Sequence, residues 1–228
     1  MPGAADSLQK IYTGGAPVFP ILLDRLRRAF PRSRPVAVYG STEAEPISHI
    51  GWEEMDEADR EIMRGGGGIL AGVPVPEIRL RLAADDEIQV AGDHVLRGYW
   101  QGVGDEENKI REGDTIWHRT GDAGRLDARG RLWLLGRCSA RIGHDLYPFT
   151  VECAASSFPW VRRSGCVETR SGRVLAVECR SGARPEPDTL RAAFAWAGID
   201  RVVVVKELPV DRRHNAKINY PALRRLVS

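Results

Sequence analysis

The chain has 228 residues, of which 43% are hydrophobic and 28% charged, the composition of a globular protein with room for one large or two modest domains. Its 33 basic and 31 acidic residues give a net charge of +2, so no strongly one-signed field favours nucleic acid or an anionic membrane as a partner. The longest β-branched run, Val202 to Val205, is far shorter than the roughly 18 apolar residues of a membrane span and predicts a buried strand instead.

Residues 1–6 contain no basic segment followed by an apolar one, so the sequence predicts no export signal and a cytoplasmic location. The cysteines at positions 138, 153, 166 and 179 form no Cys-x-x-Cys pair, and the histidines do not complete a metal-ligand spacing. We expect reduced, partly buried thiols.

An amphipathic helix is predicted over residues 18–30, where Leu22, Leu26 and Phe30 recur at a spacing of four with arginines between them, and Pro31 ends it. A short apolar run then predicts a strand. This helix-then-strand unit is typical of an α/β domain.

The five residues after that run carry the first functional signal: Tyr39, Gly40, Ser41, Thr42 and Glu43. At the carboxyl end of a strand, where open α/β sheets bind nucleotides, the ring can stack on a base and the glycine lets the backbone approach a phosphate. The hydroxyls can donate to phosphoryl oxygens, and the carboxylate can hold Mg²⁺. The alternative is a polar turn with a solvent-facing glutamate.

Further along, short alternating runs from about residue 72 predict a small antiparallel β-subdomain, with a turn at 127–130. The preceding run Gly65–Gly68 lacks the hydroxyls and lysine of a phosphate cradle and is interpreted as a flexible link. After residue 137 the mixed order of elements predicts a compact α+β module. Its expected elements are a helix after Pro148, two strands around Cys166 to Cys179, a helix over 188–197, a strand over 201–206 and a helix after Pro221.

Three more segments follow the first signal in a fixed order: Arg119-Thr120-Gly121-Asp122, Gly136-Arg137 and Asn215-Ala216-Lys217-Ile218. Together with Glu87–Gly92, Arg97–Trp100 and the early Gly14-Gly15-Ala16-Pro17, this succession resembles the adenylate-forming superfamily. That superfamily includes acyl-CoA synthetases, luciferases and the adenylation domains of peptide synthetases. The resemblance covers nearly the whole chain and implies ATP and Mg²⁺ as cofactors and a small carboxylic acid as substrate.

Some details are similar to the β-lactone synthetases of long-chain olefin biosynthesis, which adenylate a β-hydroxy fatty acid and close it to a β-lactone. The residues concerned are Ser41–Pro46, Trp117–Arg119, Leu146–Pro148 and Arg213–Lys217. An ordinary fatty acyl-CoA ligase is the alternative function. A second alternative is a fragment that binds nucleotide or partners another chain without turnover.

The resemblance assigns roles to residues of the proposed reaction. It implies that Lys217 bridges the carboxylate and the α-phosphate, that Thr42 binds the α-phosphate, and that Glu43 holds Mg²⁺. Adenylation brings two anions together, so a positioned cation is needed at the transition state. The alternative for Lys217 is a surface lysine before the last helix.

The nucleotide-binding residues implied by the resemblance are Gly14, Gly15, Ala16, Tyr39, Gly40, Ser41, Thr42, Asp122 and Arg137. Asp122 is expected to accept from both ribose hydroxyls, Arg137 to add a ribose contact and Tyr39 to stack on adenine. His118, His144 and His214 are interpreted as structural hydrogen-bonding residues, with substrate contact as the alternative for His118.

The resemblance also predicts domains: residues 1–71 as the end of a large α/β domain, 72–136 as the antiparallel subdomain, and 137–228 as a mobile α+β domain with the catalytic lysine. Family members carry an earlier Ser/Thr/Gly-rich phosphate loop, and nothing here resembles it. We therefore expect the chain to be the carboxyl-terminal part of a longer enzyme, to need a missing amino-terminal portion or chain, and to show no adenylation alone.

Departures from the family pattern concern the second half-reaction. The segment 138–143 is shorter than usual and lacks both the acidic or lysine hinge residue and the Lys-x-x-Gly loop that helps admit a pantetheine thiol. Coenzyme A is therefore a doubtful acceptor, whereas an internal β-hydroxyl needs no thiol tunnel. Ala216 replaces the usual glycine, and Tyr220 stands where a basic residue is common.

Overall fold

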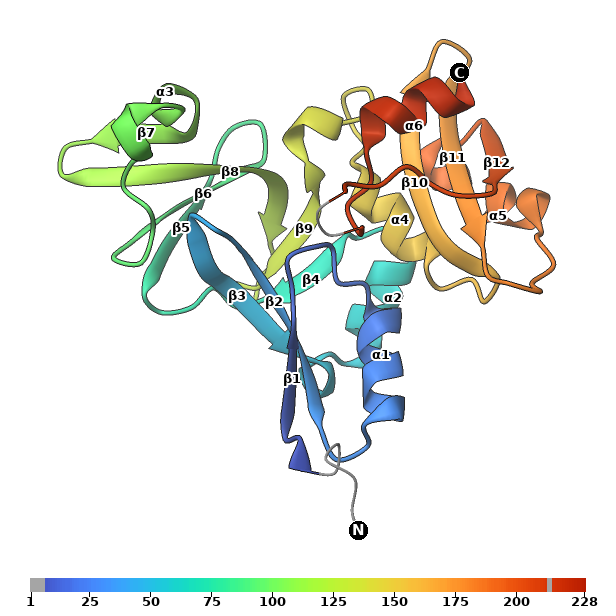
Figure 1. The fold of residues 1–228 in the computed structure, drawn as a ribbon, viewed down its shortest axis with the longest axis horizontal. Helices are drawn as coiled ribbons and strands as arrows, with labels where there is room; N and C mark the ends of the chain where they lie inside the picture. The colour runs from blue at the N-terminus through green and yellow to red at the C-terminus, as the bar shows by residue number, and fades with distance from the viewer. Residues whose placement is uncertain (1–6, 213–214) are drawn as a thin grey trace.

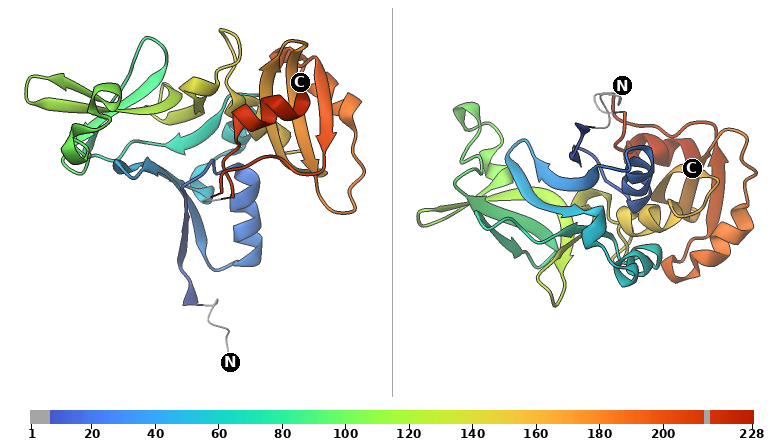
Figure 2. Two further views of the ribbon diagram at one scale, coloured as in Figure 1. Left: turned by 45° about the horizontal axis from the view of Figure 1, so that its top comes forward. Right: turned by 90° about the horizontal axis from the view of Figure 1, so that it is seen from below.

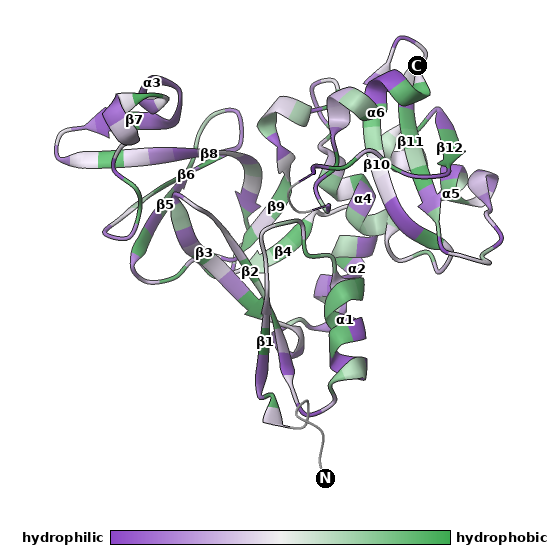
Figure 3. Ribbon diagram, in the orientation of Figure 1, coloured by the Kyte–Doolittle hydropathy of each residue, from purple (hydrophilic) through white to green (hydrophobic). Residues whose placement is uncertain are grey.

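The structure is a computed structural model that describes residues 7–212 and 215–228. Within these residues three β-sheets are joined by short helices, and the chain runs from the sheet at the amino end, through a long antiparallel sheet, to a module at the carboxyl end (Figures 1 and 2). Hydrophobic residues are concentrated in β4, β9 and β11, whereas α3 and β7 are mostly hydrophilic (Figure 3).

The first sheet has the order β1-β2-β3, formed by Lys10–Thr13, Arg34–Ser41 and Ala44–Gly51. Strands β1 and β2 are parallel and are connected by helix α1, Pro20–Ala29. The predicted helix and strand are thus confirmed. However, α1 buries Leu23 completely and leaves Leu22 39% exposed, while Leu26 and Phe30 are half-buried, so only the first position of the predicted apolar stripe is wrong.

The strand β3 and the helix α2, Glu57–Arg64, were not predicted. Strand β3 pairs antiparallel with β2, and α2 begins with a capping box in which Asp56 and Asp59 each accept from the other's backbone N–H. The short 3₁₀ helix η2, Trp52–Glu54, connects the two elements.

The glycine run after α2 is not the flexible link that we expected. A Cβ at Gly66 would lie 2.1 Å from the Trp196 ring, one at Gly67 would lie 2.3 Å from Ile62, and one at Gly68 would lie 2.5 Å from the Leu134 carbonyl oxygen. Gly66 and Gly68 also have positive φ angles. The glycines therefore allow close packing rather than free movement.

The second sheet has the order β4-β9-β8-β6-β5, with β7 added on β8, and every pairing in it is antiparallel. Its strands are β4 (Ile69–Gly72), β5 (Ile78–Leu82), β6 (Glu87–Gly92), β7 (Lys109–Glu112), β8 (Thr115–Leu126) and β9 (Leu132–Arg137). Short helices η3 (Trp100–Gly102) and α3 (Asp105–Asn108) precede β7. The predicted subdomain and its turn at 127–130 are confirmed.

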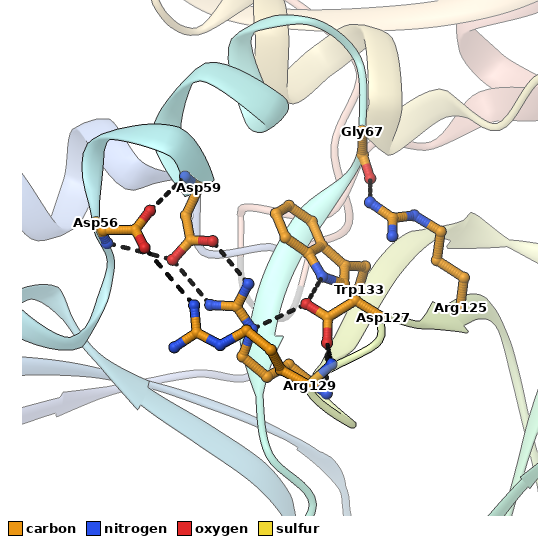
Figure 4. Close-up of polar contacts among 8 residues, drawn as sticks. Asp56, Asp59, Gly67, Arg125, Asp127, Arg129 and Trp133 are labelled. Atoms are coloured by element: carbon orange, nitrogen blue, oxygen red, sulfur yellow. Dashed lines mark hydrogen bonds and ion pairs between the residues drawn. The ribbon is translucent and has the colours of Figure 1, made fainter.

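A buried ion network holds α2 against the hairpin of β8 and β9 (Figure 4). Arg131 donates to both oxygens of Asp59 at 2.8 and 2.7 Å and to Asp127 at 2.8 Å. Trp133 Nε1 donates to Asp127 at 3.0 Å. Burial opposes the ionisation of Asp127, but hydrogen bonds from Trp133 and Arg131 outweigh it and lower the pKa of this carboxyl.

The third sheet has the order β10-β11-β12, from Val161–Thr169, Gly172–Cys179 and Arg201–Val205. It is accompanied by α4 (Pro148–Ala155), α5 (Pro187–Ala193), α6 (Tyr220–Val227) and the 3₁₀ helices η4 (Cys138–Ala140) and η5 (Ala195–Ala197). The predicted helices and strands are therefore present. The buried position predicted for Val202–Val205 is wrong, because β12 is an edge strand and Val204 is 41% exposed.

Helix α4 joins two hydrophobic cores. Its Cys153 packs in the core shared by the first two sheets, whereas Val151 and Ala154 pack in the core of the third sheet. Six of the eight residues of α4 are apolar, and a helix of this composition is expected to be buried on more than one side. In the described part of the chain the four cysteines are free, and no helix is long and apolar enough to cross a membrane.

Candidate functional site

The carboxyl ends of β1 and β2 bring two of the predicted segments together. These strands are parallel with Thr13 opposite Ala37, so the residue after β1 lies beside Val38. A Cβ at Gly14 would lie 2.7 Å from the Val38 carbonyl oxygen, which explains the glycine at this position. Gly15 has a φ of +76°, and Ala16 follows it at the same end of the sheet as Tyr39.

The hydroxyls and carboxylate of the first signal lie at the tip of the β2–β3 hairpin. Thr42 and Glu43 form a two-residue turn, with Ser41 opposite Ala44. The turn requires Gly40, because a Cβ there would lie 2.7 Å from the Ala44 carbonyl oxygen. Thr42 is exposed at this tip and is therefore accessible to a ligand.

Asp122 connects residues that are far apart in the sequence. Its Oδ2 accepts from the Tyr39 hydroxyl at 3.0 Å, and its Oδ1 accepts from Arg137 Nη1 at 3.0 Å. Arg137 lies opposite Asp122 across β8 and β9, and its Nη1 also donates to the Thr120 carbonyl oxygen at 3.2 Å. Gly121, with a φ of +69°, lies inside β8 at the irregularity in its pairing with β6, one residue before the carboxylate.

The electrostatics of this cluster keep the Tyr39 hydroxyl protonated. Burial, and then the Asp122 carboxylate, raise the pKa of Tyr39 well above its ordinary value. For Arg137 burial acts against the charge, but Asp122 outweighs it and raises the pKa. A carboxylate has about four lone-pair sites, so Asp122 can still accept from a ligand hydroxyl while it holds both partners.

Glu43 has its own set of partners, which the sequence did not identify. The Tyr99 hydroxyl donates to Glu43 Oε1 at 3.0 Å, and Lys109 lies over the Tyr99 ring at 5.2 Å while donating to the Leu96 carbonyl oxygen. Burial and then the hydrogen bond to Glu43 raise the pKa of Tyr99 to about 12. The only signal in the sequence was that Tyr99 belongs to one of the family-like segments.

The Glu43 carboxylate is suited to Mg²⁺. Burial disfavours its charge, but its backbone N–H and the Ser41 and Tyr99 hydroxyls outweigh burial and lower its pKa, so it is ionised at neutral pH. No group of three or more His, Cys, Asp or Glu side chains that could hold a metal occurs among the residues described. Glu43 as the single protein carboxylate fits a Mg²⁺ ion whose other ligands are substrate phosphates.

Lys217 is exposed, and it is held by its backbone. Its N–H donates to Asp211 Oδ1 at 2.9 Å, its carbonyl oxygen accepts from Asp211 N at 2.9 Å, and the adjacent Ile218 pairs with Val210. The views agree that this segment lies beside the loop between β1 and α1 (Figures 1 and 2). None of the described contacts of Lys217 reaches Asp122, Arg137 or Glu43.

The histidines differ in their surroundings. His118 is only 3% exposed and its Nδ1 lies 3.2 Å from the Asn108 carbonyl oxygen, which supports the structural interpretation. Burial and the nearby Lys109 lower the pKa of His118. His144 is exposed, and His214 lies outside the described residues, as does Arg213 of the lactone-synthetase-like segment.

Comparison with known proteins gives a consistent result. Residues 2–100 match the family described as AMP-binding enzyme. The chain is 33% identical over 90% of its length to an olefin β-lactone synthetase of Xanthomonas campestris, and 31% identical over 93% to the one of Stenotrophomonas maltophilia. It spans only 44% and 46% of these relatives. It is also 28% identical, over 85% of its length and 37% of the relative, to a 2-succinylbenzoate–CoA ligase of Arabidopsis thaliana.

The fold agrees with this result. Superposition on the amide bond synthetase McbA from Marinactinospora thermotolerans gives a TM-score of 0.78 at 24% identity, covering 97% of this chain and 48% of that one. For MatB from Rhodopseudomonas palustris the TM-score is 0.72 at 20% identity, with 96% and 45% covered. Residues 2–100 therefore match the AMP-binding enzyme family, and nearly the whole chain is similar in sequence and fold to less than half the length of adenylate-forming enzymes.

Proposed function

We propose that this chain supplies the ribose-binding and lysine-bearing part of an ATP-dependent ligase that joins a carboxylic acid to AMP. The observation that carries the proposal is the Tyr39–Asp122–Arg137 cluster, in which residues from two other strands converge on the Asp122 carboxylate. Because the chain spans less than half of the relatives' length, the activity is proposed for a whole enzyme that contains it.

In this proposal the cluster fixes the nucleotide. Asp122 accepts from the two ribose hydroxyls, Arg137 donates to the same sugar, and the ring of Tyr39 stacks on adenine beside the Gly14–Ala16 loop. Holding the sugar also holds the α-phosphate in place for attack. Orientation of this kind can supply about 7 to 11 kcal/mol of a reaction barrier.

In the proposed reaction, residues at the tip of the β2–β3 hairpin and on the Lys217 loop stabilise the negative charge at the reacting phosphate. A carboxylate oxygen of the acid attacks the α-phosphorus, the bond to the β-phosphate breaks, and pyrophosphate leaves. Thr42 donates to the α-phosphate, and the ammonium group of Lys217 lies between the two anions. Glu43 would hold Mg²⁺, which neutralises phosphate charge when it is bound.

We further propose a long-chain β-hydroxy acid as substrate and a β-lactone as product. In the second step the β-hydroxyl oxygen attacks the acyl carbonyl carbon, the carbonyl–phosphate bond breaks, AMP leaves and the hydroxyl proton passes to solvent. The proposal is supported by the similarity to two olefin β-lactone synthetases and by the short segment between Arg137 and Gly143, which includes η4.

A fatty acyl-CoA ligase is the second candidate, favoured by the similarity to a 2-succinylbenzoate–CoA ligase. Nucleotide binding or partnership with another chain without turnover is the third candidate. All three predict contact between this chain and a nucleotide or a partner, but they differ in whether AMP and a thioester are released.

Two measurements test the proposal. Calorimetric titration of the 228-residue chain with AMP should detect binding, and Asp122→Ala should abolish or weaken it. An adenylating enzyme that contains the chain should release AMP from ATP and a β-hydroxy fatty acid without coenzyme A. Thioester formed from an unsubstituted fatty acid only when coenzyme A is present would favour the CoA ligase, and absence of pyrophosphate release would contradict both enzyme functions.

A further inference from the structure

Glu152 is a buried carboxyl group for which the proposed reaction has no role. It lies on α4 with 2% of its surface exposed. Its Oε1 accepts from the Tyr220 hydroxyl at 3.0 Å and from the Cys166 backbone N–H at 3.1 Å, and Oε2 lies 3.1 Å from the same hydroxyl. The carboxyl thus links α4, β10 and α6.

The two groups that donate to Glu152 are neutral, which is unusual for a buried carboxyl. The other titratable groups that face it are the buried thiols of Cys153 and Cys166, whose pKa values are raised by burial and then by Glu152. Burial raises the pKa of Glu152 to about 8, so the group is mainly protonated at neutral pH. A neutral acid and a phenol can be buried together at a much lower desolvation cost than an ion pair.

Tyr220 links its contact with Glu152 to the loop that carries Lys217, which we call the lysine loop. It is the first residue of α6 and lies three positions after Lys217, and the intervening Asn219 accepts from Ala222 N at 3.0 Å while its N–H donates to the Pro209 carbonyl oxygen at 2.9 Å. The position of the Tyr220 side chain therefore constrains the backbone that leaves Lys217.

On the other side, α4 is fixed to the strand that carries Arg137. Pro148 and Tyr147, at the start of α4, pack against Gly136 so closely that a Cβ there would lie 3.0 Å from the proline ring. The charge of Arg137 also reaches Tyr220 and acts to lower its pKa, although burial and Glu152 raise it overall. A continuous path of packed residues thus runs to the lysine loop from the cluster of Tyr39, Asp122 and Arg137, which we call the nucleotide cluster.

We propose that Tyr220 and Glu152 are positioning residues that hold the Lys217 loop in register with Arg137. This inference rests on the proposed function for its kinetic consequence, but its structural consequence is independent of any reaction. Tyr220 stands where a basic residue is common in the similar family, and here its phenol lies on the Glu152 carboxyl.

The structural consequence is tested on the 228-residue chain by amide hydrogen exchange. The N–H groups of Ala216 and Lys217 both donate to Asp211, at 3.2 and 2.9 Å, and report on the loop. Tyr220→Phe should lower their protection factors about tenfold, the effect expected for the loss of one buried hydrogen bond. Tyr12→Phe is the matched control, because the Tyr12 side chain is 62% exposed. Unchanged protection in Tyr220→Phe would overturn the proposal.

The protonation of Glu152 provides a second readout. In the parent chain the protection factors of Ala216 and Lys217 should fall as the pH passes about 8, because a carboxylate then forms inside the module. Glu152→Gln, which keeps the shape but cannot ionise, should remove that fall. A fall of the same size in Glu152→Gln would contradict the role of the carboxyl, whatever the activity of the enzyme.

The kinetic consequence is tested in an adenylating enzyme that contains the chain. Tyr220→Phe should lower kcat for adenylation about tenfold and leave the KM for ATP within about twofold. In a Lys217→Ala background the same change should have no further effect, because the residue acts through the lysine. Equal losses in both backgrounds would overturn the proposal. A parent that fails to adenylate would refute the proposed function, and the exchange measurements would still decide the positioning role.

Discussion

The nucleotide cluster and the lysine loop are built in opposite ways. Tyr39, Asp122 and Arg137 lie on three strands and hold one another through side chains, so their geometry is fixed before any ligand arrives. Lys217 lies on an exposed loop whose described contacts are made by its backbone. The difference indicates that the cluster serves to bind the ligand and the lysine serves to stabilise the transition state. Binding requires a prearranged site, whereas a transition-state contact requires a group that can approach late.

The largest effect should come from the exposed lysine. In an adenylating enzyme that contains the chain, Lys217→Ala should lower kcat about 100- to 1,000-fold, the usual cost of removing one donor aimed at transition-state charge. AMP affinity, measured by calorimetry on the chain, should stay within about twofold. Lys206→Ala, at another exposed position after β12, is the matched control. Parental turnover in Lys217→Ala would remove this residue from the reaction.

Asp122 should show the reverse pattern. Asp122→Ala should weaken AMP binding about 10- to 100-fold, since each hydrogen bond to a charged group contributes about 1.5 to 3 kcal/mol. Asp122→Asn, which can still accept from Tyr39, should lose less. Asp188→Ala controls for a change of net charge, because its side chain is 97% exposed. If Asp122→Ala changed kcat and left affinity intact, the contrast between the two regions would be contradicted.

The fold was predictable where a local pattern carried the information. The hairpin of β8 and β9 follows from alternating residues around the turn at 127–130, and α4 follows from Pro148 at its first turn. Periodicity does not reveal the neighbours of a segment in space. The run Val202–Val205 has the composition of a central strand but lies at an edge of its sheet. The Gly65–Gly68 run is packed against Trp196 and Leu134, and no local sequence pattern predicts these contacts.

The candidate site was predictable to the same degree. The family-like segments identified Tyr39, Asp122 and Arg137, and the structure brings these three into one cluster. It leaves the lysine outside that cluster, because the loop is held by Asp211 and by Arg163 of β10, and not by the strands that carry the cluster. Contacts between side chains from different elements, such as Tyr99 with Glu43 and Tyr220 with Glu152, have no signature in the spacing of either residue.

A third prediction concerns the stability of the lysine-bearing module. The pKa of Glu152 is about 8 in the folded chain and near 4.3 when unfolded, so between these values the folded state binds more protons. The free energy of unfolding should therefore fall as the pH rises from about 4.3 to 8, by at most about 1.4 kcal/mol per pH unit.

Urea titrations followed by circular dichroism at pH 5, 7 and 9 measure this slope. Glu152→Gln should remove this contribution, whereas the exposed Glu186→Gln should keep the parental slope. The same slope in parent and Glu152→Gln would show that this carboxyl does not couple the module's stability to pH. None of the hydrogen bonds described for Glu152 reaches Tyr39, Asp122 or Arg137, so AMP affinity should be similar in both variants.

The smallest effect is expected for the hydroxyl of Tyr39, and it gives the finest test of the contrast. Tyr39→Phe keeps the ring that would stack on adenine and removes only the donor at 3.0 Å from Asp122. One neutral donor to a carboxylate that keeps its Arg137 partner should be worth about a 2- to 10-fold change in AMP affinity. The control Tyr12→Phe, at a side chain that is 62% exposed, should have no effect on AMP affinity.

The rates of AMP binding show whether the cluster is prearranged. If it is, the loss of affinity should appear as faster AMP dissociation measured by stopped flow, with the association rate nearly unchanged. The reason is that the hydroxyl orients Asp122 before the ligand arrives and holds it afterwards. A loss confined to the association rate would instead mean that Asp122 is ordered by the nucleotide, and the nucleotide cluster would then resemble the lysine loop rather than differ from it.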